Sequence, residues 1–90
     1  MRDLKNWNEV TKGLYRFAIC AGSCYEIAVM YHHEDTDILT ANANLYLVGT
    51  WTNKKNNLRF FERELILTGP VFACLEKAVE DYEEGIYNAL

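Results

Sequence analysis

The sequence has a single proline, three cysteines and no long apolar run. Without a hydrophobic stretch of roughly 20 residues, a membrane-spanning helix is not expected. The first residues, Met1 to Trp7, lack the apolar core of a signal peptide, so we expect a cytoplasmic protein. An odd number of cysteines in that compartment favours reduced thiols over a disulfide framework.

Motifs for catalysis and cofactor binding are also scarce. Ser23 is the only serine, and it lies in a predicted tight turn with no histidine expected nearby. No glycine-rich loop that could hold phosphate is present, and Cys20 and Cys24 lack the two-residue gap of zinc or thioredoxin-like motifs. We therefore predict neither an enzyme nor a bound cofactor.

A histidine pair precedes an acidic turn. His32 and His33 are followed by Glu34, Asp35 and Asp37, and imidazole and carboxylate groups are competent metal ligands. Adjacent residues of a strand point to opposite faces, however, so the two histidines cannot share one ion while the strand continues. The segment is predicted to be a solvated turn without a metal.

Size and composition indicate one ordered domain that spans residues 1–90, because 50% of the residues are hydrophobic and 24% are charged. The charge is unevenly distributed. From Pro70 onward five carboxylates face only Lys77, so this part alone accounts for the formal net charge of −4. The preceding residues carry eight charges of each sign.

The first half of the chain predicts a β-hairpin. Residues 14–20 and 24–31 alternate between apolar and polar, with Ala21, Gly22 and Ser23 as a three-residue loop. That loop places Cys20 opposite Cys24 and Phe17 opposite Ile27. The large apolar residues of both strands then share one face, while Arg16 and Glu26 lie diagonally on the other and can pair.

Two further strands are predicted. Residues 38–51 alternate, and the small Ala41 and Ala43 on their apolar side indicate that a helix bearing Phe72 crosses close above. In the segment from Leu58 to Leu67, either Phe61, Leu65 and Leu67 or Phe60 and Ile66 face inward, and a β-bulge would resolve the conflict.

A helix is expected over residues 69–88. Pro70 suits a first helical turn, and apolar residues recur at helical spacing at Val71, Leu75, Ala78, Val79, Tyr82 and Ile86. The fold class is therefore α+β, a four-stranded antiparallel meander over residues 13–67 with one C-terminal amphipathic helix packed on one face. Residues 1–12 remain undetermined, and Trp7 either packs against the sheet or joins an oligomer contact.

A single helix covers only one side of such a sheet. Several apolar residues are assigned to the uncovered side, and they form the candidate dimer patch: Leu14, Met30, Tyr46 and Val48. Because contiguous exposed apolar surface usually marks an interface, we expect a small non-catalytic interaction protein, homodimeric, whose further partner is unknown.

Binding of single-stranded nucleic acid is the alternative. Basic and aromatic residues alternate around the turn between the last two strands, as in proteins that contact phosphates and stack bases. The candidate nucleic-acid face comprises Arg16, Trp51, Lys54, Lys55, Arg59, Phe60 and Arg63.

The stretch from Phe60 through Ile86 combines a strand ending in an apolar triplet, a proline-started helix with an aromatic in its first turn, and an acidic tail. It resembles the end of the positive-cofactor-four family of single-stranded-DNA-binding coactivators, and the order of four strands and a helix also resembles Whirly and Pur-type folds. The resemblance implies a dimer or paired repeat that binds nucleic acid across its sheet. A third reading is an acidic nucleic-acid mimic or inhibitor, which rests on Glu76, Glu80, Asp81, Glu83 and Glu84.

Overall fold

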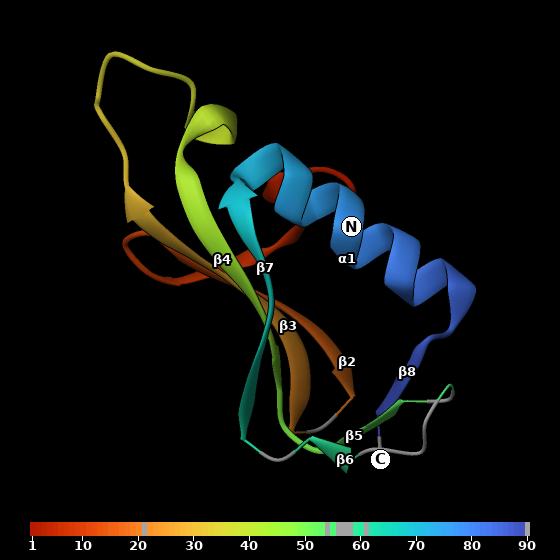
Figure 1. Ribbon diagram of the computed structural model, residues 1–90. Helices are drawn as coiled ribbons and strands as arrows, with labels where there is room; N and C mark the ends of the chain where they lie inside the picture. The colour runs from red at the N-terminus through yellow and green to blue at the C-terminus, as the bar shows by residue number, and fades with distance from the viewer. Residues whose placement is uncertain (21, 54, 56–58, 61, 90) are drawn as a thin grey trace.

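Figure 1 shows a twisted antiparallel sheet with one long helix lying across a single face of it. The computed structural model describes residues 1–20, 22–53, 55, 59–60 and 62–89. The larger sheet has five strands in the order β1-β2-β3-β4-β7, and a smaller one has three in the order β6-β5-β8. The predicted α+β class is confirmed, with a fifth strand added to the expected four.

The elements in chain order are η1 (Leu4–Asn6), β1 (Asn8–Thr11), β2 (Leu14–Cys20), β3 (Ser23–Tyr31), η2 (Ile38–Thr40), β4 (Asn42–Val48), β5 (Trp51–Asn53), β6 (Arg59–Phe60), β7 (Arg63–Pro70), α1 (Val71–Glu84) and β8 (Tyr87–Ala89).

The fifth strand, β1, lies at one edge of the larger sheet, within the segment that the sequence left undetermined. Asn8 pairs with Arg16 and Glu9 pairs with Tyr15. All four residues of β1 are exposed, so the strand lacks the alternation of apolar and polar residues that marks a half-buried strand. Trp7, just before it, is tucked against the sheet, with its ring centroid 5.6 Å from that of Phe17.

The β2–β3 hairpin has the predicted faces but a different register. Tyr15 lies opposite Ile27 and Phe17 opposite Tyr25, two positions from the predicted pairs. The predicted register is wrong because Ser23 already belongs to β3, which makes the turn shorter than three residues. A shift of two residues keeps every side chain on its face. The predicted Cys20–Cys24 pair is therefore also wrong, since Cys24 lies opposite Ala18.

The predicted strand over residues 38–51 is broken into three parts. Residues Ile38–Thr40 form a 3-10 turn, η2, whose first free N–H groups are capped by Asp37 through a 3.0 Å bond from the Leu39 N–H. After β4 the chain turns at Gly49, which has φ +105°, and β5 then leaves the larger sheet. Because Gly49 adopts this left-handed φ, the strand ends there, although the alternation of apolar and polar residues continues along the sequence.

A bulge in β7 resolves the conflict predicted for the last strand of the sheet. Leu67 lies opposite Leu45, but Leu65 lies opposite the next residue, Tyr46, so Ile66 is the extra residue. Ile66 and Leu67 pack against the core, whereas Leu65 is exposed on the other face. Phe61 lies outside the described residues, and only the backbone of Phe60 is described.

The helix α1 begins and ends differently from the prediction. Pro70 is its N-cap, and the N–H of Val71 donates to the Ala41 carbonyl at 2.9 Å. The helix ends at Glu84, not at residue 88, because Gly85 adopts the left-handed conformation (φ 65°) and its N–H donates to the carbonyl of Asp81. Residues 87–89 then form β8, which pairs with β5.

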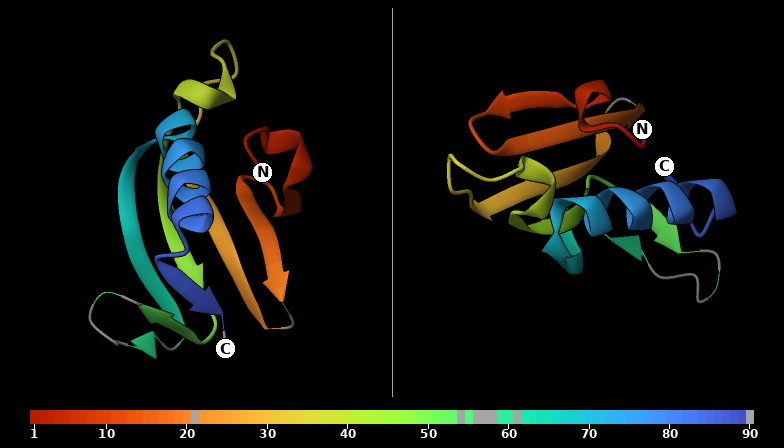
Figure 2. Two further views of the ribbon diagram at one scale, coloured as in Figure 1. Left: turned by 90° about the vertical axis from the view of Figure 1, so that its right-hand side faces the viewer. Right: turned by 90° about the horizontal axis from the view of Figure 1, so that it is seen from above.

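One layer of side chains fills the space between the larger sheet and α1, which lies mainly over β4 and β7 and also contacts β3 (Figure 2). Of the residues predicted to lie between sheet and helix, Tyr25, Ile27, Leu45, Leu47, Val71, Leu75, Ala78 and Val79 are buried, whereas Tyr15, Phe17, Ile19 and Val29 are only partly buried against them. Cys74 is the residue that covers Ala43, with its Sγ 3.9 Å from the Ala43 carbonyl oxygen. The predictions that Phe72 covers Ala41 and Ala43 and that Tyr82 belongs to the buried side of the helix are wrong. Both side chains are about half exposed and line surface cavities.

Candidate functional site

The face of the five-stranded sheet that points away from α1 is the main candidate surface, and we call it the outer face. In the described part of the chain no helix covers it (Figures 1 and 2). Strand register assigns to it Leu14, Arg16, Ala18, Cys24, Glu26, Ala28, Asn44, Tyr46, Val48, Arg63, Leu65 and Thr68. With two arginines and one glutamate, these positions carry a net charge of +1.

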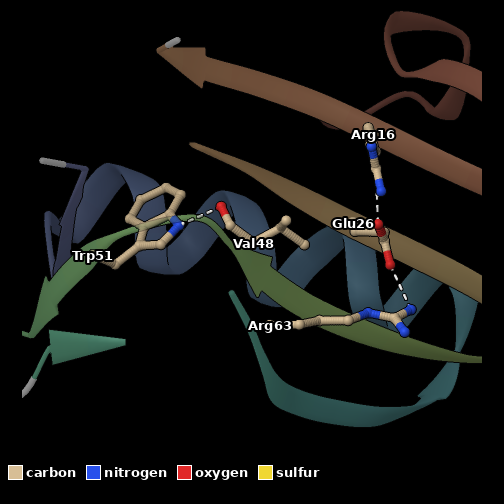
Figure 3. A network of polar contacts seen from close by, with 5 residues as sticks. All are labelled: Arg16, Glu26, Val48, Trp51 and Arg63. Carbon is tan, nitrogen blue, oxygen red and sulfur yellow. Dashed lines mark hydrogen bonds and ion pairs between the residues drawn. The ribbon is translucent and has the colours of Figure 1, made fainter. Parts of the chain in front are cut away.

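At the centre of the outer face Glu26 accepts from two arginines. Its Oε2 is 2.8 Å from Arg16 Nε, and its Oε1 is 2.5 Å from an Arg63 terminal nitrogen (Figure 3). The Glu26 side chain is only 2% exposed, although it stands on an open sheet face. The two arginine side chains flank the carboxylate on either side, and they themselves stay 43% and 48% exposed.

Strand pairing explains how these residues meet. Glu26 lies in β3 directly opposite Arg16 of β2 and, on its other side, opposite Tyr46 of β4. The predicted pairing of Arg16 with Glu26 is confirmed, though the two are directly opposite rather than diagonal. Arg63 comes from β7 and reaches across β4, so its guanidinium lies 3.8 Å from the centre of the Tyr46 ring.

The polar network continues from Tyr46 toward β7. The Asn44 amide donates to the Tyr46 hydroxyl at 3.2 Å, and the Thr68 hydroxyl donates to the Asn44 side-chain oxygen at 2.7 Å. Four neighbouring strands are thus linked by side chains on this face. Such a network presents a rigid surface whose hydrogen-bonding groups are largely occupied within the chain.

Two titratable groups of the outer face have shifted pKa values. The hydrogen bond from Arg16 to Glu26 raises the pKa of the guanidinium above its ordinary value. Burial raises the pKa of the neighbouring Cys24 thiol, which disfavours the reactive thiolate at neutral pH. The surface therefore offers charged donors and an aromatic ring rather than an activated nucleophile.

The predicted nucleic-acid face is only partly assembled. Arg16 and Arg63 come together on the outer face, but the prediction that Trp51 lies there is wrong. Trp51 is 1% exposed, packs against Tyr25 at 5.3 Å between ring centroids and donates from Nε1 to the Val48 carbonyl oxygen at 2.9 Å (Figure 3). An aromatic residue in a strand is more often core than exposed, and here its indole N–H has a backbone partner.

Two of the remaining basic residues of that predicted face, Lys55 and Arg59, lie in or near the small sheet. Lys55 is in an exposed turn, where its N–H donates to the side chain of Asn53. Lys54 lies outside the described residues, and the description of Arg59 and Phe60, in β6, is confined to their backbone.

Three residues of the candidate dimer patch, Leu14, Tyr46 and Val48, lie on the outer face. Leu14 is opposite Ala28, and Val48 is opposite Cys24 and Arg63. Tyr46 lies beneath the Arg63 guanidinium, and Met30 is in a bulge near the end of β3, where it is 53% exposed. Sequence reasoning predicted the pairing of Glu26 with Arg16 but missed Arg63 as the second partner, so it did not identify Glu26 as the centre of a cluster.

The acidic residues of α1 do not form one surface. Glu76, Glu80, Glu83 and Glu84 are exposed, but the assignment of Asp81 to that face is wrong. Asp81 is buried, and its Oδ1 lies 3.1 Å from Lys77 Nζ. The hydrogen bond to Asp81 raises the pKa of Lys77. The pKa of the Tyr25 phenol is raised first by desolvation and then by the charge of Asp81.

Among the described residues, no group of three or more histidine, cysteine and acidic side chains is placed to hold a metal ion. His32 Nε2 lies 2.7 Å from the Thr36 carbonyl oxygen within the turn, and all three cysteines are present as thiols. In the same described ranges, no helix is both long enough and apolar enough to cross a bilayer.

Comparison of the chain with protein-family models, curated proteins and solved structures finds no match. The resemblance to the positive-cofactor-four family stays a prediction.

Proposed function

We propose that this chain is a small non-catalytic interaction protein that forms a homodimer through its outer face. The observation that carries the proposal is the central Arg16–Glu26–Arg63 cluster, in which one carboxylate binds both arginines within one chain. Burying a charge without a partner in an interface is costly, but a charge that already has a partner adds much less to that cost. A second copy can therefore cover this face with one net positive charge left on each chain, rather than three separate charges without partners.

The rest of the outer face suits close packing. Ala18, Ala28 and Cys24 are small, and Leu14 and Val48 add apolar surface on either side of the cluster. Packed sheets approach to about 10 Å, which small and medium side chains allow. A two-fold axis uses the same patch twice and is the commonest symmetry of soluble oligomers.

Sedimentation equilibrium at micromolar concentration tests the homodimer. The wild-type chain should sediment at twice its 10.4 kDa mass. Leu65→Lys places a charge on the proposed interface, at an exposed position of the outer face where it should not unfold the chain, and should shift the equilibrium toward monomer. Phe72→Lys is the matched control, since Phe72 is about as exposed but lies on α1. A wild-type monomer, or equal effects of the two variants, would contradict the proposal.

A second candidate function is single-stranded nucleic-acid binding on the same face. The specific observation in its favour is the guanidinium of Arg63 held over the Tyr46 ring, next to the half-exposed Arg16. Aromatic and guanidinium planes are the groups on which unpaired bases stack, and arginines contact phosphates. Tyr46 takes the stacking role that the sequence assigned to Trp51.

Anisotropy of a fluorescein-labelled oligothymidylate, titrated at several salt concentrations, tests this candidate. Arg63→Ala should weaken binding and reduce the slope of log affinity against log salt by about 0.7, the contribution of a single phosphate contact to single strands. Arg2→Ala removes the same charge from the opposite side of the molecule and should leave the slope unchanged. Absence of binding at low salt would reject the candidate and leave the homodimer unaffected.

A further inference from the structure

The inner face of the larger sheet is incompletely covered. Five strands at about 4.8 Å spacing span roughly 19 Å, whereas one helix is about 10 Å wide. Accordingly α1 lies over β4, β7 and β3, and the inner side of β2 is left to the N-terminal segment (Figure 2). In that segment Trp7 packs on Phe17 and donates from Nε1 to the Met1 carbonyl at 2.8 Å.

The N-terminal segment leaves a groove along α1. Leu4, Leu39, Phe72 and Leu75 line a cavity of about 520 Å³ at one end. The next cavity, of about 470 Å³, lies between Phe17, Val79 and Tyr82, and the two share Arg2 and Asp3 in their walls. We call these two neighbouring cavities together the α1 groove. Phe72 is 47% and Tyr82 51% exposed in it, so its helical wall is an apolar stripe without a full partner.

The length of the groove suits a short helix. From Phe72 to Tyr82 the wall extends about 15 Å at 1.5 Å per residue, which matches about three turns of a partner helix. A helix lying in a groove is held by apolar anchors spaced at i, i+3, i+4 and i+7.

Charge at the rim indicates which helix fits. Glu76 and Glu83 line the groove from α1 and Asp3 from the opposite wall, against one basic residue, Arg2. Arg2 is bound to Glu83 at 3.0 Å, in a pair whose side chains are 72% and 60% exposed. Such exposed pairs are worth only about 0–1 kcal/mol, so an incoming basic side chain can replace Arg2 on Glu83 at little cost.

A second copy is the wrong occupant. The only α-helix among the described residues is α1, whose exposed carboxylates would meet the acidic rim of the groove. Like charges brought together across an interface oppose binding. We therefore propose that the α1 groove binds a basic amphipathic helix of a different protein, independently of the outer face.

Synthetic peptides test this proposal. The probe is a Leu/Lys peptide of about 14 residues with leucines at i, i+3, i+4 and i+7, and its twin replaces every lysine with glutamate. Isothermal titration calorimetry should show micromolar or tighter binding of the Leu/Lys peptide and no binding of the Leu/Glu twin. In a spectrum of backbone amides, the shifts should be confined to α1, η2, β2 and residues 1–7.

Variants locate the interaction. Glu76→Lys should weaken binding of the Leu/Lys peptide at least about tenfold, because it reverses a charge in the wall of the groove. Glu84→Lys makes the same change in net charge on an exposed helix position outside the groove and should change affinity less than about twofold. Phe72→Ser should weaken binding, and Leu65→Ser, equally exposed on the outer face, should not.

Three results would overturn the proposal. These are failure of the Leu/Lys peptide to bind at micromolar concentration, equal binding of its acidic twin, or equal effects of Glu76→Lys and Glu84→Lys. None of them bears on the homodimer, whose interface variant lies outside the α1 groove.

Discussion

Replacing Glu26 with alanine removes one carboxylate that serves two arginines. Each hydrogen bond to a charged group contributes about 1.5–3 kcal/mol net, so two bonds set an upper limit of about 3–6 kcal/mol. Arg16 and Arg63 are 43% and 48% exposed, however, and recover much of their hydration when the carboxylate is lost. We therefore expect Glu26→Ala to lower the free energy of unfolding by about 2–3 kcal/mol.

Urea denaturation measures this loss, and the m-value should not change, because the surface exposed on unfolding stays the same. For a domain of this size the midpoint of thermal unfolding should fall by about 10–20 °C. The matched control is Glu83→Ala, which breaks the exposed pair with Arg2 and should cost less than about 1 kcal/mol.

Salt separates the two glutamates further. In about 1 M salt the Debye length is near 3 Å, so the effect of Glu83→Ala should vanish. Much of the effect of Glu26→Ala should remain, because water and ions are excluded from a carboxylate that is 2% exposed. A loss below about 0.5 kcal/mol for Glu26→Ala, or equal losses for the two variants, would refute the role assigned to the cluster.

Three further predictions concern the interior. Leu75→Ala should cost about 2–5 kcal/mol because Leu75 is buried, whereas Leu65→Ala, exposed on the outer face, should cost less than about 1 kcal/mol by urea denaturation. Burial, and then the charge of Asp81, raises the pKa of the Tyr25 phenol above its ordinary value of 10.0. The phenol is protonated in both states below about pH 10, and above it only the unfolded chain ionises, so stability should fall as the pH rises further. Tyr25→Phe should flatten this alkaline decline in urea midpoint, and Tyr31→Phe, at an exposed position, should not; equal slopes would contradict the assignment. Cys74 is buried with a raised thiol pKa, so its alkylation in the native protein should be far slower than that of exposed Cys20, as measured by mass spectrometry of labelled peptides.

The alternation of apolar and polar residues predicted which face of the sheet each side chain occupies better than it predicted which residues pair across neighbouring strands. Phe17 and Tyr25 share the inner face in any register that differs by two residues, so the apolar pattern determines the face but leaves the turn length open. The helix was predicted for the same reason, from the spacing of Val71, Leu75 and Ala78. Its end was not, because the left-handed conformation of Gly85 depends on the hydrogen bonds that close the last turn.

The candidate site was harder to predict than the fold. The pairing of Arg16 with Glu26 follows from two neighbouring strands, whereas the approach of Arg63 depends on the bulge in β7 and on its pairing with β4. The position of Trp51 was difficult to predict for the same reason. It was assigned to a surface because basic residues surround it in sequence, but β5 leaves the larger sheet and turns the indole into the core.

Gly49 has a consequence for how this sequence can diverge. A Cβ placed on it would lie 2.1 Å from the Gly22 carbonyl oxygen and 2.8 Å from the Ser23 Cα, and its φ of +105° already disfavours any other residue. Its N–H also donates to the Glu62 carbonyl oxygen at 2.7 Å, so three stretches of backbone meet where no side chain fits. Charged surface residues can be substituted during evolution, but this position can hold only glycine. A distant homologue should therefore be recognisable by a glycine directly after its fourth strand, even where the arginines and glutamates have changed.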